Sequence, residues 1–248
     1  MSKTTTCFNL GWMLASRGSR AVMVDADPQC NLTGLVLELS AEDALEEFYA
    51  DNPGSNLKDA LDPAFRSRPV PLKPIECVPV EGQEGLFLAP GHVALAEDET
   101  SLGVAQQLSE SLQRLRNLPG SFSHLFQITA EKYHADYVIV DLSPGLGAIN
   151  QNLVATSDYC LVPCSPDVFS VMAIDSLSRI LPKWIEWARR AHKLEVLAEA
   201  DYPFPEPKLK FLGVVVQRFR IRSGLPTMAF QSTSTSSIQR SPTHSFLS

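Results

Sequence analysis

The sequence predicts an α/β protein in which helices cover both faces of a doubly wound, mostly parallel β-sheet. Short apolar runs recur along the 248-residue chain and predict buried strands at residues 21–24, 86–89, 137–140, 159–162 and 211–216. Segments with the apolar spacing of helices lie between these runs, at residues 4–16, 41–50, 102–117, 122–133 and 168–198. This alternation of strands with helices is typical of a parallel sheet.

The first predicted helix covers residues 4–16. Cys7, Leu10 and Leu14 lie on one face at helical spacing, and Gly18 favours a stop after the last turn. The apolar run that follows has the length of a single strand buried on both faces.

The chain between the first two apolar runs is expected to be mixed. Residues 25–33 predict a loop at the carboxyl end of the first strand. The acidic, amphipathic segment 41–50 predicts a surface helix. Residues 51–84 contain many prolines and little periodicity, so we expect an irregular excursion with one short helix near residues 57–61.

The second half of the chain repeats the strand and helix pattern. The run at 137–140 ends in Asp141, and further strands are expected after it. The long segment 168–198 predicts helix with an interruption at Pro182, because proline lacks a backbone N–H and clashes with the preceding turn.

The composition limits the classes of function. With 44% hydrophobic residues the chain can bury a sizeable core, and we expect one domain over residues 1–226. The Ser- and Thr-rich residues 227–248 predict a disordered tail. The net charge of −7 argues against attraction of the whole molecule to nucleic acid, and the sequence predicts no membrane span. Five scattered cysteines without zinc-ligand spacing indicate a reduced, cytoplasmic protein.

A lysine followed by hydroxyl residues opens the first predicted helix, at Lys3, Thr4 and Thr5. In a phosphate-binding loop, N–H groups at a helix start surround the phosphate, a lysine neutralises it, and the next hydroxyl ligates Mg²⁺. The same residues also fit a charged helix start at a chain end, so this motif alone leaves both interpretations open.

Carboxylates follow two of the predicted strands. Asp25 and Asp27 come after the strand at 21–24, and Asp141 ends a later strand. Ligands of open α/β sheets bind at the carboxyl ends of the strands, where a carboxylate can position a water or a metal ion. The alternative interpretation of the first pair is an Asx-type turn before Pro28.

These motifs resemble the ParA family of partitioning ATPases, which belongs to the deviant Walker A group of P-loop NTPases together with MinD. The Asp-Ala-Asp-Pro-Gln segment, at its distance from Lys-Thr-Thr, is the most specific part of the resemblance. The likeness covers about residues 2–222 and rests on the segments 2–6, 24–33, 140–147, 155–163 and 211–219. It implies that residues 1–226 form a P-loop ATPase domain.

The resemblance implies a role for each residue of the phosphate loop. Lys3 would neutralise the phosphates and take part in catalysis, and Thr4 would ligate Mg²⁺. Ser2 and Thr5 would contact the nucleotide, and Asp27 would activate the attacking water.

Further roles follow from the same resemblance. Asp25 would support the water shell of the metal, and Asp141 would be the Walker B carboxylate. Gln217 and Arg218 would approach the adenine base of ATP.

The resemblance also implies partners and a place of action. The chain would bind ATP and Mg²⁺, form an ATP-sandwiched homodimer and bind DNA nonspecifically, without contact with a membrane. A centromere-binding partner protein would stimulate hydrolysis, and the cycle would drive chromosome or plasmid partitioning in the cytoplasm, in association with the nucleoid.

The sequence departs from the family pattern in its phosphate loop. The family reads Lys-Gly-Gly-x-Gly-Lys-Thr-Thr after a first strand, whereas here Ser2 takes the place of the last glycine and the preceding residues are absent. We therefore expect a chain that lacks the first strand and is incomplete at both ends. The alternatives are a nonhydrolysing or degenerate nucleotide-binding protein and a MinD-like positioning ATPase.

A basic run is the sequence feature closest to a nucleic-acid site. It consists of Lys208, Lys210, Arg218, Arg220 and Arg222. The run predicts either a DNA-backbone patch or a solvated strand end followed by a loop.

Overall fold

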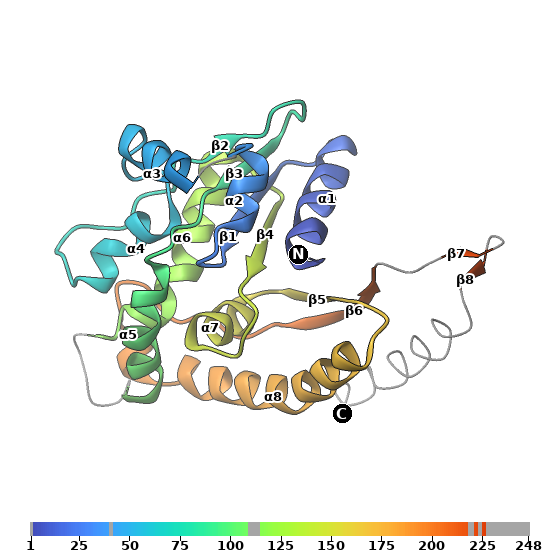
Figure 1. Cartoon of the computed structure of the whole chain (residues 1–248). Helices are drawn as coiled ribbons and strands as arrows, with labels where there is room; N and C mark the ends of the chain where they lie inside the picture. Colours follow the sequence, from blue (N-terminus) through green and yellow to red (C-terminus); the bar gives the residue numbers. More distant parts are fainter. Residues whose placement is uncertain (1, 40–41, 109–114, 218–220, 223–224, 227–248) are drawn as a thin grey trace. The chain divides into compact units, whose positions relative to one another are not determined.

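The computed structural model of the protein has the predicted α/β class and forms two compact units (Figure 1). The first unit comprises residues 3–153 and 191–205, and the second comprises residues 154–190 and the described residues from 206 onward. The structure describes residues 2–39, 42–108, 115–217, 221–222 and 225–226.

The first unit is built on a four-stranded, mostly parallel sheet in the order β2-β3-β1-β4. Strand β1 (Ala21–Ala26) lies between β3 (Leu86–Ala89) and β4 (Tyr137–Leu142) and pairs with both in parallel. The short β2 (Val78–Pro79) is antiparallel to β3. All residues of β1 are buried, which explains why this strand is an unbroken apolar run until Asp25.

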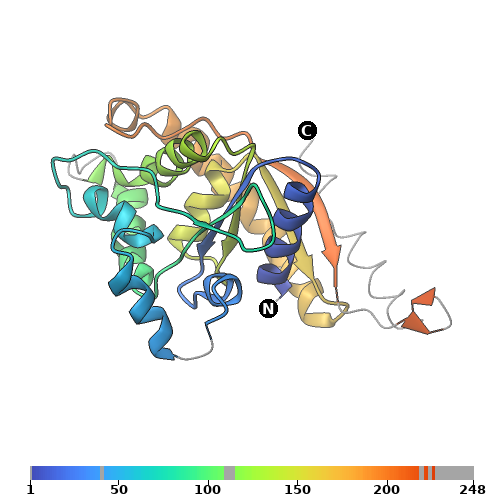
Figure 2. The same cartoon turned by 90° about the horizontal axis from the view of Figure 1, so that it is seen from above.

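Helices cover both faces of this sheet, as Figure 2 shows. Val22 and Val24 belong to a core cluster that includes side chains of α4, α5 and α6, whereas Met23 belongs to a second cluster with α1 and α2. This division follows from the strand geometry, because successive side chains point to opposite faces. The bounds of these helices are α1 (Ser2–Ser16), α2 (Asn31–Val36), α4 (Leu57–Phe65), α5 (Leu95–Leu108) and α6 (Leu118–Tyr133).

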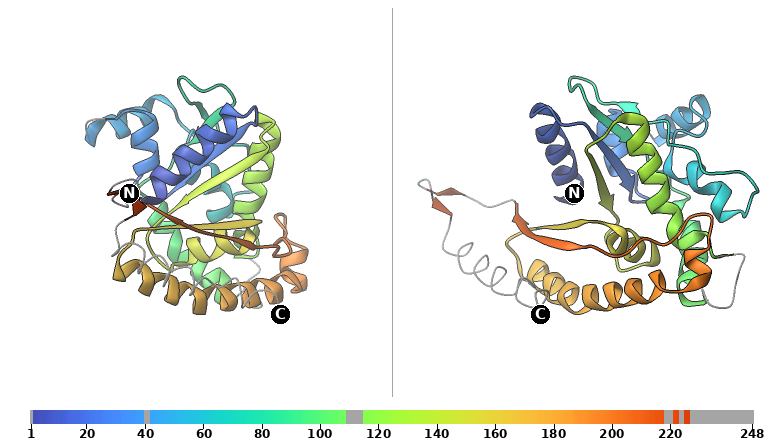
Figure 3. Two further views of the ribbon diagram at one scale, coloured as in Figure 1. Left: turned by 90° about the vertical axis from the view of Figure 1, so that its right-hand side faces the viewer. Right: turned by 180° about the vertical axis from the view of Figure 1, so that it is seen from behind.

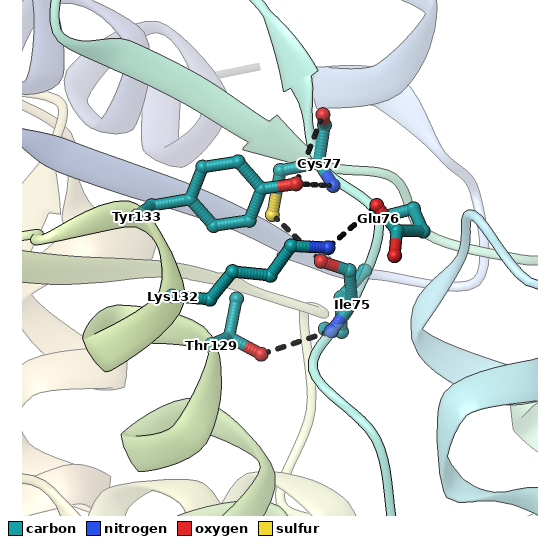
Figure 4. A network of polar contacts seen from close by, with 6 residues as sticks. All are labelled: Ile75, Glu76, Cys77, Thr129, Lys132 and Tyr133. Atoms are coloured by element: carbon teal, nitrogen blue, oxygen red, sulfur yellow. Dashed lines mark hydrogen bonds and ion pairs between the residues drawn. The ribbon is translucent and has the colours of Figure 1, made fainter.

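The proline-rich excursion is anchored by side chains of α6, as Figure 4 shows. The N–H of Ile75 donates to the Thr129 hydroxyl at 3.1 Å, and the N–H of Cys77 donates to the Tyr133 hydroxyl at 2.8 Å. Each of these bonds satisfies a backbone donor that no strand partner serves, with a net worth of about 1 kcal/mol. The excursion contains α4, near the short helix expected at residues 57–61, and the short β2, and these bonds order the irregular chain between the two elements.

The second unit contains a parallel pair of strands and one long helix (Figure 3). Strand β5 (Tyr159–Cys164) pairs with β6 (Lys210–Val216), and α8 (Val168–His192) lies beside them. Ile174 and Leu181 of α8 line a small apolar pocket together with residues of both strands, so the helix packs on this pair.

The expected interruption at Pro182 is wrong, because α8 continues through this residue. The proline itself is exposed, while the neighbouring Leu181, Trp184 and Ile185 are buried. Burial of these flanking side chains holds the helix together across the missing hydrogen bond.

Several element boundaries differ from those expected. Strand β1 extends to Ala26, and α2 occupies part of the expected loop at residues 25–33. The expected helix at residues 102–117 begins earlier, at Leu95, and the expected 122–133 helix begins at Leu118.

The remaining short elements complete the described chain. Helix α7 (Ala148–Thr156) was not expected, because its polar first half shows no apolar period. The others are α3 (Glu42–Asp51), α9 (Glu195–Ala198), β7 (Ile221–Arg222) and β8 (Leu225–Pro226). The expected tail at residues 227–248 lies outside the described residues. Among the helices that the structure describes, none is long and apolar enough to cross a membrane.

Candidate functional site

Four polar side chains of the first unit gather at the carboxyl end of its sheet. Thr4 stands in the first turn of α1, Asp25 and Asp27 lie at the end of β1, and Asp141 lies near the end of β4. Asp25 and Asp141 are direct register partners across the parallel ladder. All four residues are buried, with exposed fractions of 8%, 0%, 6% and 2% in the order named.

Asp141 has an acceptor oxygen without a partner. The Thr4 side chain forms a hydrogen bond with this carboxylate, and Lys3 lies close enough to attract it. Its Oδ2 atom is buried and has no hydrogen-bond partner in the part of the chain that the structure describes. Burial raises the pKa of Asp141, whereas Thr4 and Lys3 oppose that rise. A buried, unpartnered carboxylate oxygen beside a hydroxyl fits a divalent cation or its bound water.

Asp25 uses both carboxylate oxygens inside the protein. Oδ1 accepts the N–H of Asp27 at 3.2 Å, and Oδ2 accepts the N–H and the hydroxyl of Thr33, both at 2.8 Å. Burial raises the pKa of Asp25 to about 6, while these hydrogen bonds lower it and the nearby Asp141 raises it further. Asp25 is thus an acceptor that is satisfied by the chain itself.

Asp27 lies in the loop that follows Asp25. Its Oδ1 accepts the N–H of Gln29 at 3.0 Å, and its carbonyl accepts the N–H of Cys30 at 2.8 Å. The Asx-type turn considered from the sequence is therefore present. Such a turn fixes the direction of the Asp27 side chain and does not exclude a role in binding.

The thiol of Cys7 lies next to the carboxylates. Burial raises its pKa well above the ordinary value, and the charges of Asp141 and Asp25 raise it further. A thiol in this environment stays protonated and is a poor nucleophile, and Cys7 packs in the core cluster that α1 and α2 form with β1.

Three of the other expected ligands, Ser2, Thr5 and Gln217, lie within the described residues. Thr5 is exposed on α1, and Ser2 contributes the first residue of that helix. Gln217 belongs to the second unit, where its N–H donates to the carbonyl of Cys164 at 2.8 Å. Arg218 lies outside the described residues. Contact of this pair with a base stays a prediction.

Sequence reasoning missed the residues that hold the two loops of the site. Thr33 supports Asp25, and Asn150 supports the loop after Asp141 by donating to the carbonyls of Ser143 and Gly145 at 3.0 and 2.9 Å. Thr33 could have been recognised from the sequence, because it is the last residue of the Asp-Ala-Asp-Pro-Gln-Cys-Asn-Leu-Thr segment that carries the family resemblance. No periodicity marked Asn150 within its polar run.

Comparison with known proteins places the chain in a family. A family model described as an AAA domain matches residues 1–194. The chain belongs to this AAA-domain family, and its resemblance to the ParA family is confirmed. The chain is 28% identical over 226 residues to protein MJECL24 of Methanocaldococcus jannaschii, covering 91% of this chain and 72% of that protein. It is 28% identical over 183 residues to the sporulation initiation inhibitor protein Soj of Bacillus subtilis, covering 73% of this chain and 59% of Soj.

Solved structures agree with the fold of this chain. Protein DIP2308 of Corynebacterium diphtheriae matches with a TM-score of 0.67 at 23% identity, over 98% of this chain and 86% of that one. Cobyrinic acid a,c-diamide synthase of Mycobacterium smegmatis, with bound ADP and magnesium, matches with 0.60 at 20% identity, over 94% and 75%. The pNOB8 ParA bound to nonspecific DNA matches with 0.58 at 17% identity, over 96% and 69%. At these identities the likeness shows the fold alone.

Proposed function

We propose that this ParA chain binds ATP with Mg²⁺ and hydrolyses the terminal phosphate bond to drive chromosome or plasmid partitioning. The observation that carries the proposal is the buried Asp141 carboxylate, which is hydrogen-bonded with Thr4 and whose Oδ2 has no partner among the described residues. An uncompensated buried acceptor of this kind is costly unless a ligand completes it. The ADP and magnesium in the related synthase structure support the same choice of ligands.

Binding is assigned to the first turn of α1. Lys3 would supply the positive charge for the phosphates. The N–H groups of the helix start, together with the hydroxyls of Ser2 and Thr5, would donate hydrogen bonds to the phosphate oxygens. Thr4 and Asp141 would hold Mg²⁺, with Asp25 in its water shell. Bound Mg²⁺ would neutralise the charge that develops on the phosphate oxygens.

Hydrolysis is assigned to Asp27. Its carboxylate would accept a hydrogen bond from a water and orient the oxygen toward the terminal phosphorus. The bond from that phosphorus to the bridging oxygen then breaks, giving ADP and phosphate. The Asx turn restricts rotation of the Asp27 side chain and so fixes the orientation of its carboxylate.

The wider cycle is part of the same proposal. ATP would close two copies into a dimer, the dimer would bind DNA nonspecifically, and a centromere-binding partner would stimulate hydrolysis in the cytoplasm, on the nucleoid. The solved structure of pNOB8 ParA bound to nonspecific DNA supports the DNA-binding part of this proposal. The chain spans 59% of Soj, so the activities of the whole relatives are inferred for this chain.

The proposal is tested by following Mg-ATP binding and phosphate release in four proteins. Wild type should gain stability with ligand, by about 2.7 kcal/mol at a hundredfold excess over Kd, and Lys3→Ala should lose that gain. Asp27→Asn should keep the gain while phosphate release falls by roughly a hundredfold or more. Asp51→Asn alters an exposed carboxylate of α3 and serves as the matched control.

The outcomes separate the functions considered. A folded wild type without a ligand-dependent shift would contradict ATP binding. A shift without turnover, unchanged by Asp27→Asn, would favour the nonhydrolysing alternative. Binding to lipid vesicles in the presence of ATP would instead favour a MinD-like activity.

A further inference from the structure

We propose that Thr33 is a positioning residue for the hydrolytic step, because its buried hydroxyl ties Asp25 to Gly91 and so holds the segment that carries Asp27. This inference rests on the proposed function. It adds a residue that does not touch the nucleotide and acts through the aspartate pair.

The hydroxyl of Thr33 makes two hydrogen bonds whose directions are determined. Gly91 N–H donates to Thr33 Oγ1 at 2.9 Å, and Thr33 Oγ1 lies 2.8 Å from Asp25 Oδ2. An amide N–H only donates, and a hydroxyl has a single proton. The Thr33 proton is therefore directed at Asp25, because the Gly91 N–H already occupies the acceptor side of the same hydroxyl oxygen.

Bulk solvent does not reach the Thr33 hydroxyl. Thr33 and Asp25 are both 0% exposed. A buried donor or acceptor that loses its partner bears the full cost of desolvation. Opening the bridge would therefore leave its buried groups without a hydrogen bond, which stabilises the closed arrangement.

The second oxygen of Asp25 transmits this restraint to Asp27. Asp25 Oδ1 accepts the Asp27 N–H at 3.2 Å while Oδ2 is held by Thr33. Rotation of the carboxylate would break one set of bonds or the other. The backbone of Asp27 is therefore fixed from one side by Asp25, and its side chain is fixed from the other by the Gln29 N–H.

Gly91 brings a third segment to the same point. A Cβ at residue 91 would lie 2.8 Å from the Asp25 carbonyl oxygen, so the close approach requires glycine. The carbonyl of Gly91 accepts the hydroxyl of Tyr49, on α3, and the Tyr49 ring lies 4.6 Å from that of His92. The Thr33 hydroxyl, in α2, therefore connects the end of β1 at Asp25 with the segment after β3 at Gly91.

The role depends on the hydroxyl and not on the volume of the side chain. Thr33→Val keeps the shape and removes the hydroxyl, leaving the Gly91 N–H and one bond to Asp25 unmade. Thr33→Ser keeps the hydroxyl and removes a methyl group. The matched control is Thr129→Val, since Thr129 is also buried, donates to the Leu125 carbonyl at 2.7 Å and accepts the Ile75 N–H at 3.1 Å, away from the aspartates.

The first measurement compares kcat for ATP hydrolysis with the Kd of Mg-ATP in these variants. Thr33→Val should lower kcat by about tenfold or more, with Kd changed by less than about threefold, because a small displacement of a reacting group acts on the chemical step. Thr33→Ser should restore most of kcat. Thr129→Val should lower the thermal midpoint and leave kcat near that of wild type.

The second measurement does not depend on turnover. Backbone amide exchange of Asp27 and Gly91 should become faster in Thr33→Val and return toward wild type in Thr33→Ser, while amides of residues 21–24 stay protected. Thr129→Val should leave both amides unchanged. If Thr33→Val does not fold, Tyr49→Phe can be used, because it removes the hydrogen bond from the Tyr49 hydroxyl to the Gly91 carbonyl. This variant should increase the exchange rate of the Gly91 amide.

The outcomes distinguish this inference from the proposed function. An unchanged kcat and unchanged exchange at Asp27 in folded Thr33→Val would overturn the positioning role. A wild type that binds or hydrolyses no ATP would overturn the proposed function instead. In that case only the exchange rate of the Asp27 amide in Thr33→Val tests the inference. Faster exchange than in wild type would support the restraint by Thr33, and unchanged exchange would reject it.

Discussion

The carboxylate of Glu99, on α5, accepts a hydrogen bond from the backbone N–H of Ile149 at 3.2 Å, in the first turn of α7. The first N–H groups of a helix have no partner within the helix, and a carboxylate there also complements the helix dipole. Gly147 makes this approach possible, because a Cβ at that position would overlap Glu99 Oε1. The Glu99 side chain therefore attaches the loop after Asp141 to α5, and Gln106 of the same helix adds a bond from its side-chain amide to the Ala148 carbonyl at 3.0 Å.

A double-mutant cycle on this pair should be strongly non-additive. Glu99→Ala should lower the free energy of unfolding by about 1 kcal/mol, since a helix start loses its acceptor. Gly147→Ala should cost a similar amount by displacing the carboxylate, yet should cost little in the Glu99→Ala background. Urea unfolding of the four proteins gives the coupling energy, and additive effects would mean that Glu99 does not support α7.

Two helical glycines of the first unit should respond in opposite directions to alanine. A Cβ at Gly120, on α6, would overlap the backbone carbonyl of Tyr202, whereas a Cβ at Gly103, on α5, would make an ordinary contact at 3.6 Å with Ala148. Gly120→Ala should therefore destabilise the protein by about 1–3 kcal/mol. Gly103→Ala should stabilise it by up to about 1 kcal/mol, because alanine is the better helix former.

Thermal or urea unfolding of the two variants checks this contrast directly. Both substitutions add one methyl group to a helix, so each is the control for the other. Equal effects would show that the segment around Tyr202 can move away from α6 at no cost.

The pH dependence of stability should reveal the buried Asp25. Burial raises its pKa from 3.8 to about 6, so the folded state holds this proton more tightly than the unfolded state. The resulting stabilisation is fully present below the unfolded value and is lost as the pH rises through about 6. The shift corresponds to about 3 kcal/mol at most.

The comparison with Asp25→Asn isolates this contribution. The stability of wild type relative to the variant should fall by up to about 1.4 kcal/mol per pH unit between pH 4 and 6 and should level off above about pH 7. Urea midpoints across this range provide the measurement. A difference that does not vary with pH would mean that Asp25 has an ordinary pKa in the folded protein.

The strands and the position of the site could be predicted because they depend on local pattern and on one rule of topology. The run 86–89 is buried on a parallel sheet, and β3 has these bounds in the structure. Asp25 and Asp141 were expected at one edge because the carboxyl ends of parallel strands meet there, and they are register partners.

The parts that could not be predicted depend on contacts between distant residues. Helix α7 begins with a polar run whose start is completed by Glu99, about fifty positions earlier in the chain. Thr33 reaches Gly91 across a sequence separation of 58 residues. Neither pairing could be predicted from apolar periodicity. A single hydrogen bond between a side chain and a distant backbone group produces no repeating pattern in the sequence.

The DNA arm of the proposed function makes its own prediction about the second unit. Lys208 and Lys210 are exposed there, at the start of β6, while Arg218 and Arg220 lie outside the described residues. A lysine that contacts a phosphate releases counterions, so its loss should reduce the dependence of binding on salt.

Binding of duplex DNA of unrelated sequences, measured with ATP over a range of salt concentrations, tests this arm. Lys208→Gln and Lys210→Gln should each weaken binding equally for all sequences and reduce the slope of log K against log salt by about 0.9. Lys73→Gln removes the same charge from an exposed position of the first unit and should leave the slope unchanged. Slopes that equal the wild-type slope in all three variants would favour the solvated strand end over the DNA-backbone patch. A slope change in Lys73→Gln as well would indicate that binding responds to net charge, and that no particular surface of the second unit faces the phosphates.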